Sequence, residues 1–183
     1  DVSSFKSLIP NLRDNRTHAL LKILPRESKR LIVKGVLEMP EIKRVLDRGW
    51  FVVSRGITPS YILEEITELK FDNPNCTAGI ITEGRMASVH EEDRLGPWLF
   101  RDGKLDETPA PEALCLFEAR DVSIKGANAV DPDGNLGVFA ADPAGGTVGG
   151  IWPTLTARGA HWVAPVSLER LIPSVIEAAR HCG

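Results

Sequence analysis

The sequence has few of the residues that build disulfide or metal scaffolds. Its 183 residues include three cysteines, Cys76, Cys115 and Cys182, with no Cys-x-x-Cys pair and no cysteine–histidine cluster at zinc-ligand spacing. An odd number of scattered cysteines is typical of a reducing compartment, so we expect a cytoplasmic protein. We also expect neither a bound metal nor a redox cofactor.

Long apolar runs and an excess of positive charge are absent as well. No stretch of 18 apolar residues occurs, so the sequence predicts no membrane span. The formal net charge is -3, which argues against nucleic acid and anionic membranes as partners. The Gly-x-Gly-x-x-Gly, Gly-x-Ser-x-Gly and His-Glu-x-x-His motifs are also missing, so the sequence does not support dinucleotide binding or two common classes of hydrolase.

What the chain does contain is the composition of an ordinary globular protein. Hydrophobic residues make up 43% and charged residues 26% of the sequence, enough to bury a core. The length fits a single α/β domain over residues 1–183, with a helical segment at about 1–48. Apolar residues there recur at spacings of three and four, which predicts helices near 17–24, 28–38 and 40–48.

The pattern changes after Gly49 from helical to strand-like. The apolar run at 50–54 predicts a strand buried on both faces, followed by a polar loop at 55–60 and a helix at 61–69. A hairpin is expected to turn at Asp102-Gly103. The remaining strands are predicted at 77–82, 121–125, 136–140 and 160–166, and the remaining helices at 112–117, from the glycine loop to about 157, and at 168–181.

Buried strands that alternate with helices predict a Rossmann-like, mainly parallel sheet flanked by helices. Such sheets bind ligands outside the carboxyl ends of their strands. Three loops follow strands in this sequence, at 55–60, 126–131 and 142–150, and they should converge in one sheet.

Each of these loops has both a binding and a purely structural interpretation. Gly56, Thr58 and Ser60 could hold an anion at a helix N-terminus, or Thr58 could simply cap the helix before Pro59. Glycines 145, 146, 149 and 150, which surround Thr147, fit either the close approach of a ligand or a tight turn. Lys125 could contact an anion or reach into solvent.

The order of these segments resembles a known superfamily. Ser54-Arg55-Gly56-Ile57-Thr58-Pro59-Ser60 is similar to the phosphate loop of ribose-phosphate isomerases and glucosamine-phosphate deaminases. Lys125-Gly126-Ala127-Asn128-Ala129-Val130-Asp131 resembles their acidic segment, and Gly145-Gly146-Thr147 resembles their next glycine-rich loop. The resemblance spans about residues 28–172 and extends to CoA-transferases and to a prokaryotic group that shares the Lys-Gly-Ala-Asn-Ala and Gly-Gly-Thr blocks.

The resemblance implies an isomerase- or CoA-transferase-like fold and a pocket for a small anion. Lys125, Asn128 and Ala129 occupy positions where the isomerases have acidic residues, whereas Asp131 keeps its acid. Asp131 and Lys125 are therefore the candidate catalytic residues. The candidate ligand-binding residues are Gly56, Thr58, Ser60, Gly126, Asn128, Gly145, Gly146 and Thr147.

The sequence accordingly favours the binding of a small anionic metabolite, a phosphorylated one in the first instance, such as a sugar phosphate or a CoA ester. Isomerase or transferase chemistry would follow if the site is catalytic. The alternative is a noncatalytic ligand sensor or structural protein of the same fold, and a homodimer is left open.

Overall fold

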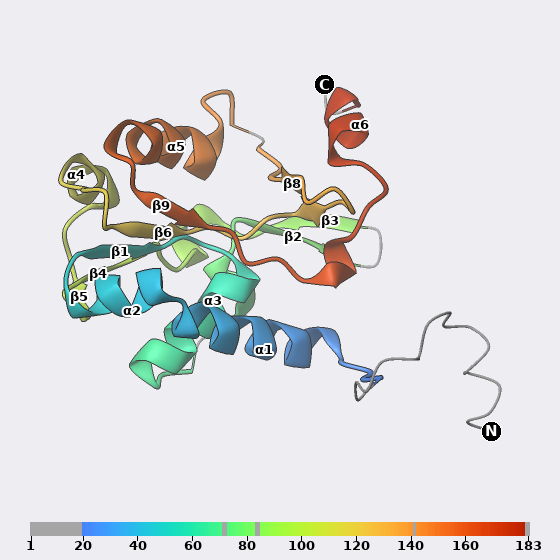
Figure 1. The fold of residues 1–183 in the computed structure, drawn as a ribbon. Coiled ribbons are helices and arrows are strands. Elements are labelled where there is room, and N and C mark those ends of the chain that lie inside the picture. Colours follow the sequence, from blue (N-terminus) through green and yellow to red (C-terminus); the bar gives the residue numbers. More distant parts are fainter. Residues whose placement is uncertain (1–19, 71–72, 83–84, 141, 182–183) are drawn as a thin grey trace.

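The computed structural model describes residues 20–70, 73–82, 85–140 and 142–181, built around a five-stranded sheet of order β5-β4-β1-β6-β9 (Figure 1). Its strands are β1 (Trp50–Val53), β4 (Trp98–Arg101), β5 (Lys104–Asp106), β6 (Val122–Ile124) and β9 (His161–Val163). Strands β1, β6 and β9 are parallel, whereas β4 and β5 are antiparallel. The protein is thus mixed α/β. A mainly parallel sheet was expected, but only the three strands on one side of this sheet are parallel.

Side chains alternate along β1, and helices cover both faces of the sheet. Phe51 and Val53 belong to the core under α1 (Pro25–Glu38), α2 (Pro40–Asp47) and α3 (Ile57–Thr67). Trp50 and Val52 face the opposite way and pack against α4 (Ala110–Cys115) and α5 (Gly146–Arg158). Figure 1 shows α1–α3 below the sheet and α4 and α5 above it.

The helical segment before the sheet begins later than the sequence predicts. Residues 20–24 are not helical, and the rest of the helix predicted at 17–24 lies outside the described residues. Helix α1 begins at Pro25, three residues before the predicted start, because proline suits the first helical turn. The Leu24 backbone N–H donates to the Glu27 carboxylate at 2.8 Å, which closes this end of the helix.

The predicted strands at 77–82 and 136–140 do not join the main sheet. The first contributes β2 (Gly79–Thr82), which pairs with β3 (Arg85–Ser88) in a separate hairpin. The second is reduced to β8 (Leu136–Gly137), paired with β7 (Ala129–Val130). The described part of the chain also has short 3₁₀ helices, η2 (Asn73–Cys76), η3 (Glu91–Asp93) and η4 (Leu168–Arg170).

The terminal helix predicted at 168–181 is also broken. After η4 the chain becomes extended, and the Ile172 N–H donates to the Val130 carbonyl at 2.9 Å. Pro173 has no N–H with which to continue a helix, so α6 (Val175–Arg180) starts only beyond it.

Other predictions are confirmed, namely the strand at 50–54 and the hairpin that turns at Asp102-Gly103. In the part of the chain that the structure describes, every helix is too short or too polar to span a bilayer.

The first turns of α5 depend on glycine at some positions and not at others. Gly145 caps the helix at φ 80°, and Gly146 follows at φ 54°, both values that side-chain-bearing residues rarely adopt. At Gly149 a Cβ atom would overlap the Ala144 carbonyl oxygen, whereas at Gly150 it would meet nothing within 4 Å. Gly149 therefore has no room for a side chain, whereas the neighbouring Gly150 does.

We expect Gly149→Ala and Gly150→Ala to change stability in opposite directions. Gly150→Ala should stabilise the protein by about 1 kcal/mol, because alanine is the better helix former and the space is open. Gly149→Ala should lower stability because the chain at Ala144 must move. Urea unfolding of the two variants and the wild type measures both effects. A Gly149→Ala variant at least as stable as the wild type would contradict the close approach at Gly149.

Candidate functional site

The carboxyl ends of the parallel strands bring together residues from distant parts of the chain. The Ser54 N–H donates to the Ile124 carbonyl at 2.9 Å, which extends the pairing of β1 with β6 by one residue. The Lys125 N–H likewise donates to the Val163 carbonyl at 3.1 Å. Ser54 and Lys125 thus occupy neighbouring positions where β1 and β6 end.

A cavity of about 260 Å³ opens beside this edge, between β1 and the helices α4 and α5. It is partly open to solvent and mostly apolar. Its lining residues are Val52, Ser54, Arg55, Pro97, Ala110, Pro111, Leu114, Thr147, Gly150 and Ile151. The first and third predicted loops therefore meet here, through Arg55 and Thr147.

Ser54 is the most unusual residue of the cavity. Strand alternation puts its side chain on the same face as Val52, and the residue is only 1% exposed. Its hydroxyl has no hydrogen-bond partner among the described residues. A buried hydroxyl without a partner is uncommon because it has lost its bonds to water. Its position in the cavity wall means that a ligand could supply the missing bond.

The Ser123 hydroxyl is also buried without a partner among the described residues. Ser123 lies on β6 beside Val52 in the strand register, one step farther from the carboxyl end than Ser54. It does not line the cavity. Both serines thus lie on the same face of the sheet, and both hydroxyls lack a partner within the described ranges. Only Ser54 lines the cavity.

Two cationic side chains lie at the same edge. Arg55 lines the cavity, and its Nε donates to the Leu95 carbonyl at 3.3 Å. Lys125 lies beside the cavity rather than in its lining, and its Nζ donates to the Arg55 carbonyl at 3.4 Å. Burial lowers the pKa of Lys125, and no carboxylate among the described residues forms an ion pair with it. This part of the site therefore holds a half-buried lysine with no carboxylate partner in the part of the chain that the structure describes.

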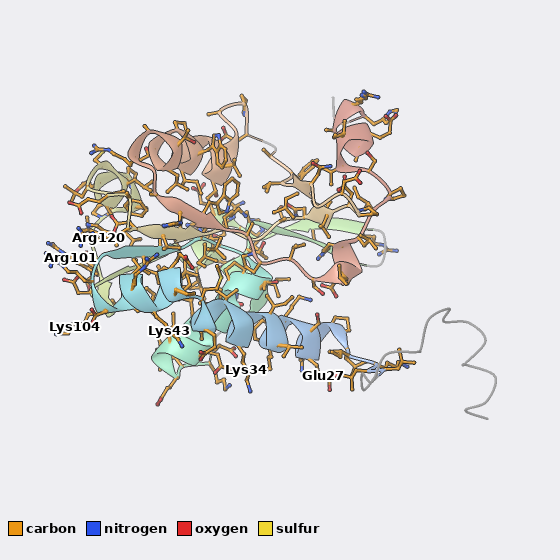
Figure 2. The ribbon with its side chains drawn as sticks, in the orientation of Figure 1. Glu27, Lys34, Lys43, Arg101, Lys104 and Arg120 are labelled. Carbon is orange, nitrogen blue, oxygen red and sulfur yellow. The ribbon has the colours of Figure 1, made fainter. Side chains whose placement is uncertain are left out.

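Other cations of the sheet are arranged differently. Arg101, Lys104 and Arg120 gather at the opposite edge, where β1 and β6 begin, and all three are exposed (Figure 2). The fields of such exposed charges are screened by water and salt. The positive charge at the carboxyl edge is less solvated and has a stronger effect on an anion nearby.

Helix α5 contributes its N-terminus to the cavity wall through Thr147. The helix has 13 residues and no side-chain cap. Backbone N–H groups in the first turn of a helix lack partners within the helix and favour negative charge. Ser54, Arg55 and this end of the helix all line the cavity, and each is a group that could bind an anion.

The first sequence-predicted loop has a different role. Gly56 is the N-cap of α3, so Thr58 belongs to the first helical turn and the expectation that it caps the helix is wrong. The Gly56 N–H donates to the Cys76 carbonyl at 2.6 Å, and the buried Ser60 donates its hydroxyl to the Ile57 carbonyl at 2.7 Å. Gly56 and Ser60 thus use these donors within the protein.

The second loop is also engaged in internal contacts. Gly126 packs close to Pro59 and the Pro165 carbonyl, so this loop does meet the first one. The Asn128 side-chain oxygen accepts from the Phe139 N–H at 3.0 Å and helps to close the β7–β8 hairpin. Neither residue lines the cavity, and nor do Gly145 and Gly146.

Asp131 anchors two segments to each other. Its carboxylate accepts from the Asn135 backbone and side chain at 2.9 and 3.0 Å, and from the Val175 N–H at 2.9 Å. The Val175 N–H is the main cause that lowers its pKa, burial acts in the opposite direction, and Asn135 adds to the lowering. The residue is 4% exposed and outside the cavity lining, which leaves little of the carboxylate for the acid/base role that the sequence suggested.

Sequence reasoning missed Ser54 and Arg55 as site residues. Both stand directly after an apolar strand, and this position is the signal that could have identified them. Among the described residues, no group of three histidine, cysteine, aspartate or glutamate side chains is placed to hold a metal ion.

Asp131→Asn should destabilise the protein, because an amide places donor hydrogens against N–H groups that need an acceptor. The lowered pKa means that the stabilisation is complete above the ordinary aspartate value and is lost as the pH falls through the folded-state value. The variant should therefore lose part of the wild-type acid dependence below about pH 4.

Urea unfolding at neutral and acidic pH tests this expectation, with Asp133→Asn as the exposed control in the same turn. Equal stability of the two variants at neutral pH would show that Asp131 is not an anchor.

Comparison of the chain with models of protein families, with curated proteins and with solved structures finds no match. What the protein does is therefore inferred from the cavity and the side chains around it.

Proposed function

We propose that this protein binds a small anionic metabolite in the cavity at the carboxyl ends of β1 and β6. The observation that carries this proposal is the Ser54 hydroxyl, which is buried and unpartnered among the described residues and belongs to a residue that lines the cavity. Leaving such a group unsatisfied costs about 1–3 kcal/mol. An acceptor oxygen on a ligand would remove that cost on binding.

The charges around the cavity support an anion as that ligand. Arg55 and Lys125 are both cationic and both lie at this edge, and the lining contains no carboxylate. Buried charges are normally paired, so an anion that approaches Lys125 would supply its counter-ion. The N-terminus of α5 favours the same sign of charge.

The location also fits what the sequence resemblance implies. In open α/β sheets ligands bind outside the carboxyl ends of parallel strands, and β1, β6 and β9 form such a parallel set. We therefore keep the Rossmann-like, isomerase- or CoA-transferase-like fold as a proposal. Ser54, Arg55 and Thr147 replace Gly56 and Ser60 as the proposed anion contacts.

Enzymatic activity is a second candidate, favoured by one observation. Burial lowers the pKa of Lys125, which increases the fraction of neutral amine available to accept a proton. The described lining residues include neither histidine nor carboxylate, so Lys125, which lies beside the cavity, would be the base in isomerase or transferase chemistry. A binding protein without turnover needs only the cationic form of this residue.

Ser54→Ala tests the anion site against a matched control, Ser123→Ala. Both substitutions remove a buried, unpartnered hydroxyl and should leave stability unchanged or higher. Only Ser54→Ala should weaken the binding of anions, by about tenfold or more, since a hydrogen bond to a charged group contributes about 1.5–3 kcal/mol.

Calorimetric titration with inorganic phosphate, acetate and ribose 5-phosphate measures this difference. If Ser54→Ala and Ser123→Ala bind these anions as tightly as the wild type, the cavity is not the anion site.

Lys125→Met should raise stability at neutral pH and lower anion affinity. The depressed pKa means that the charged form of Lys125 is disfavoured in the folded protein, so removing the charge removes a destabilising contribution below the ordinary lysine pKa of about 10.4. Thermal unfolding with and without phosphate reads both effects. A variant that loses stability but keeps its affinity would indicate a structural role for Lys125.

A further inference from the structure

The cavity changes in polarity from the sheet edge towards the interior. Ser54 and Thr147 lie near the ends of their elements, at the carboxyl edge of the sheet. Val52 lies two residues back along β1, and Ile151 lies one turn farther along α5, both buried in the core. Leu114 of α4 joins them. A ligand whose anionic group sits at the polar edge would extend its remaining atoms among apolar side chains.

This arrangement discriminates between classes of anion. The polar side chains of the lining are Ser54, Arg55 and Thr147, and an anionic group uses them. The other lining residues are apolar apart from Gly150, and no side chain among them can bond to a hydroxyl group. Hydroxyl groups of a sugar placed there would lose their bonds to water without replacement, which is unfavourable.

The volume limits the size of the ligand. At about 260 Å³ the cavity is smaller than the range of about 300–1,000 Å³ for pockets that hold drug-sized ligands. A short apolar chain or a single ring fits such a space, whereas a nucleotide-containing ester would remain largely outside it.

We infer that the preferred ligand is a small organic anion with an apolar body, and that polyhydroxylated anions are disfavoured. The inference rests on the proposed function, because it takes the anionic group to be held at Ser54 and Arg55. Apolar side chains Val52, Leu114 and Ile151 then select the body of the ligand by excluding water from it.

Titration of the full chain with acetate, butyrate, hexanoate and gluconate tests the inference. Inorganic phosphate serves as an anion without an organic part. Affinity should increase about fourfold for each added methylene group until the cavity is full. Gluconate has the same number of carbons and the same charge as hexanoate, and it should bind no more tightly than acetate.

Leu114→Phe fills the inner end of the cavity and should remove the increase in affinity from acetate to hexanoate. Leu116→Phe is the matched control, because Leu116 is exposed just beyond the same helix and does not line the cavity. Ala110→Leu fills a less buried part of the lining and provides the same test if Leu114→Phe does not fold.

The outcomes separate the two proposals. Tighter binding of gluconate or ribose 5-phosphate than of hexanoate, or affinity that does not change with chain length, overturns the apolar selectivity and leaves the anion site in place. A chain-length dependence that survives in both cavity-filling variants also overturns it. If none of these anions binds, both proposals fail.

Discussion

The rest of the structure depends on the burial of β1 on all sides. This strand lies between β4 and β6, and all four of its residues are buried beneath helices on both faces. A strand in that position cannot turn a polar residue towards solvent. Ser54 is the first polar residue after the apolar run, and its side chain therefore lies inside the protein. The cavity between β1, α4 and α5 lies next to it.

The carboxyl edge of the sheet consequently holds groups that lower the stability of the protein when no ligand is bound. The Ser54 hydroxyl lacks a partner among the described residues, and the half-buried Lys125 has a pKa that desolvation lowers. Asp121 is also buried, but its carboxylate accepts from the Trp50 and Glu118 N–H groups. Unsatisfied groups beside a cavity are typical of binding sites, where function opposes stability.

Local patterns in the sequence predicted several individual elements and the α/β class, but they did not predict which strands pair over long range. The apolar run at 50–54 and the Asp102-Gly103 turn define strands by their own residues, and both are confirmed. The sheet order depends on contacts between segments about 40 to 70 residues apart, such as β1 with β4 and β6, which periodicity does not encode. The break before α6 could have been predicted, because Pro173 interrupts the pattern.

The candidate site was predicted less well because residue type does not show whether a polar group is already bonded. Ser60 and Ser54 look alike in the sequence, yet Ser60 donates to the Ile57 carbonyl, whereas the Ser54 hydroxyl has no partner in the described part of the chain. Asp131 looks catalytic in its segment, but three donors already occupy its carboxylate. Hydrogen-bond satisfaction, which only the folded chain reveals, distinguishes polar residues that hold the protein together from those available to a ligand.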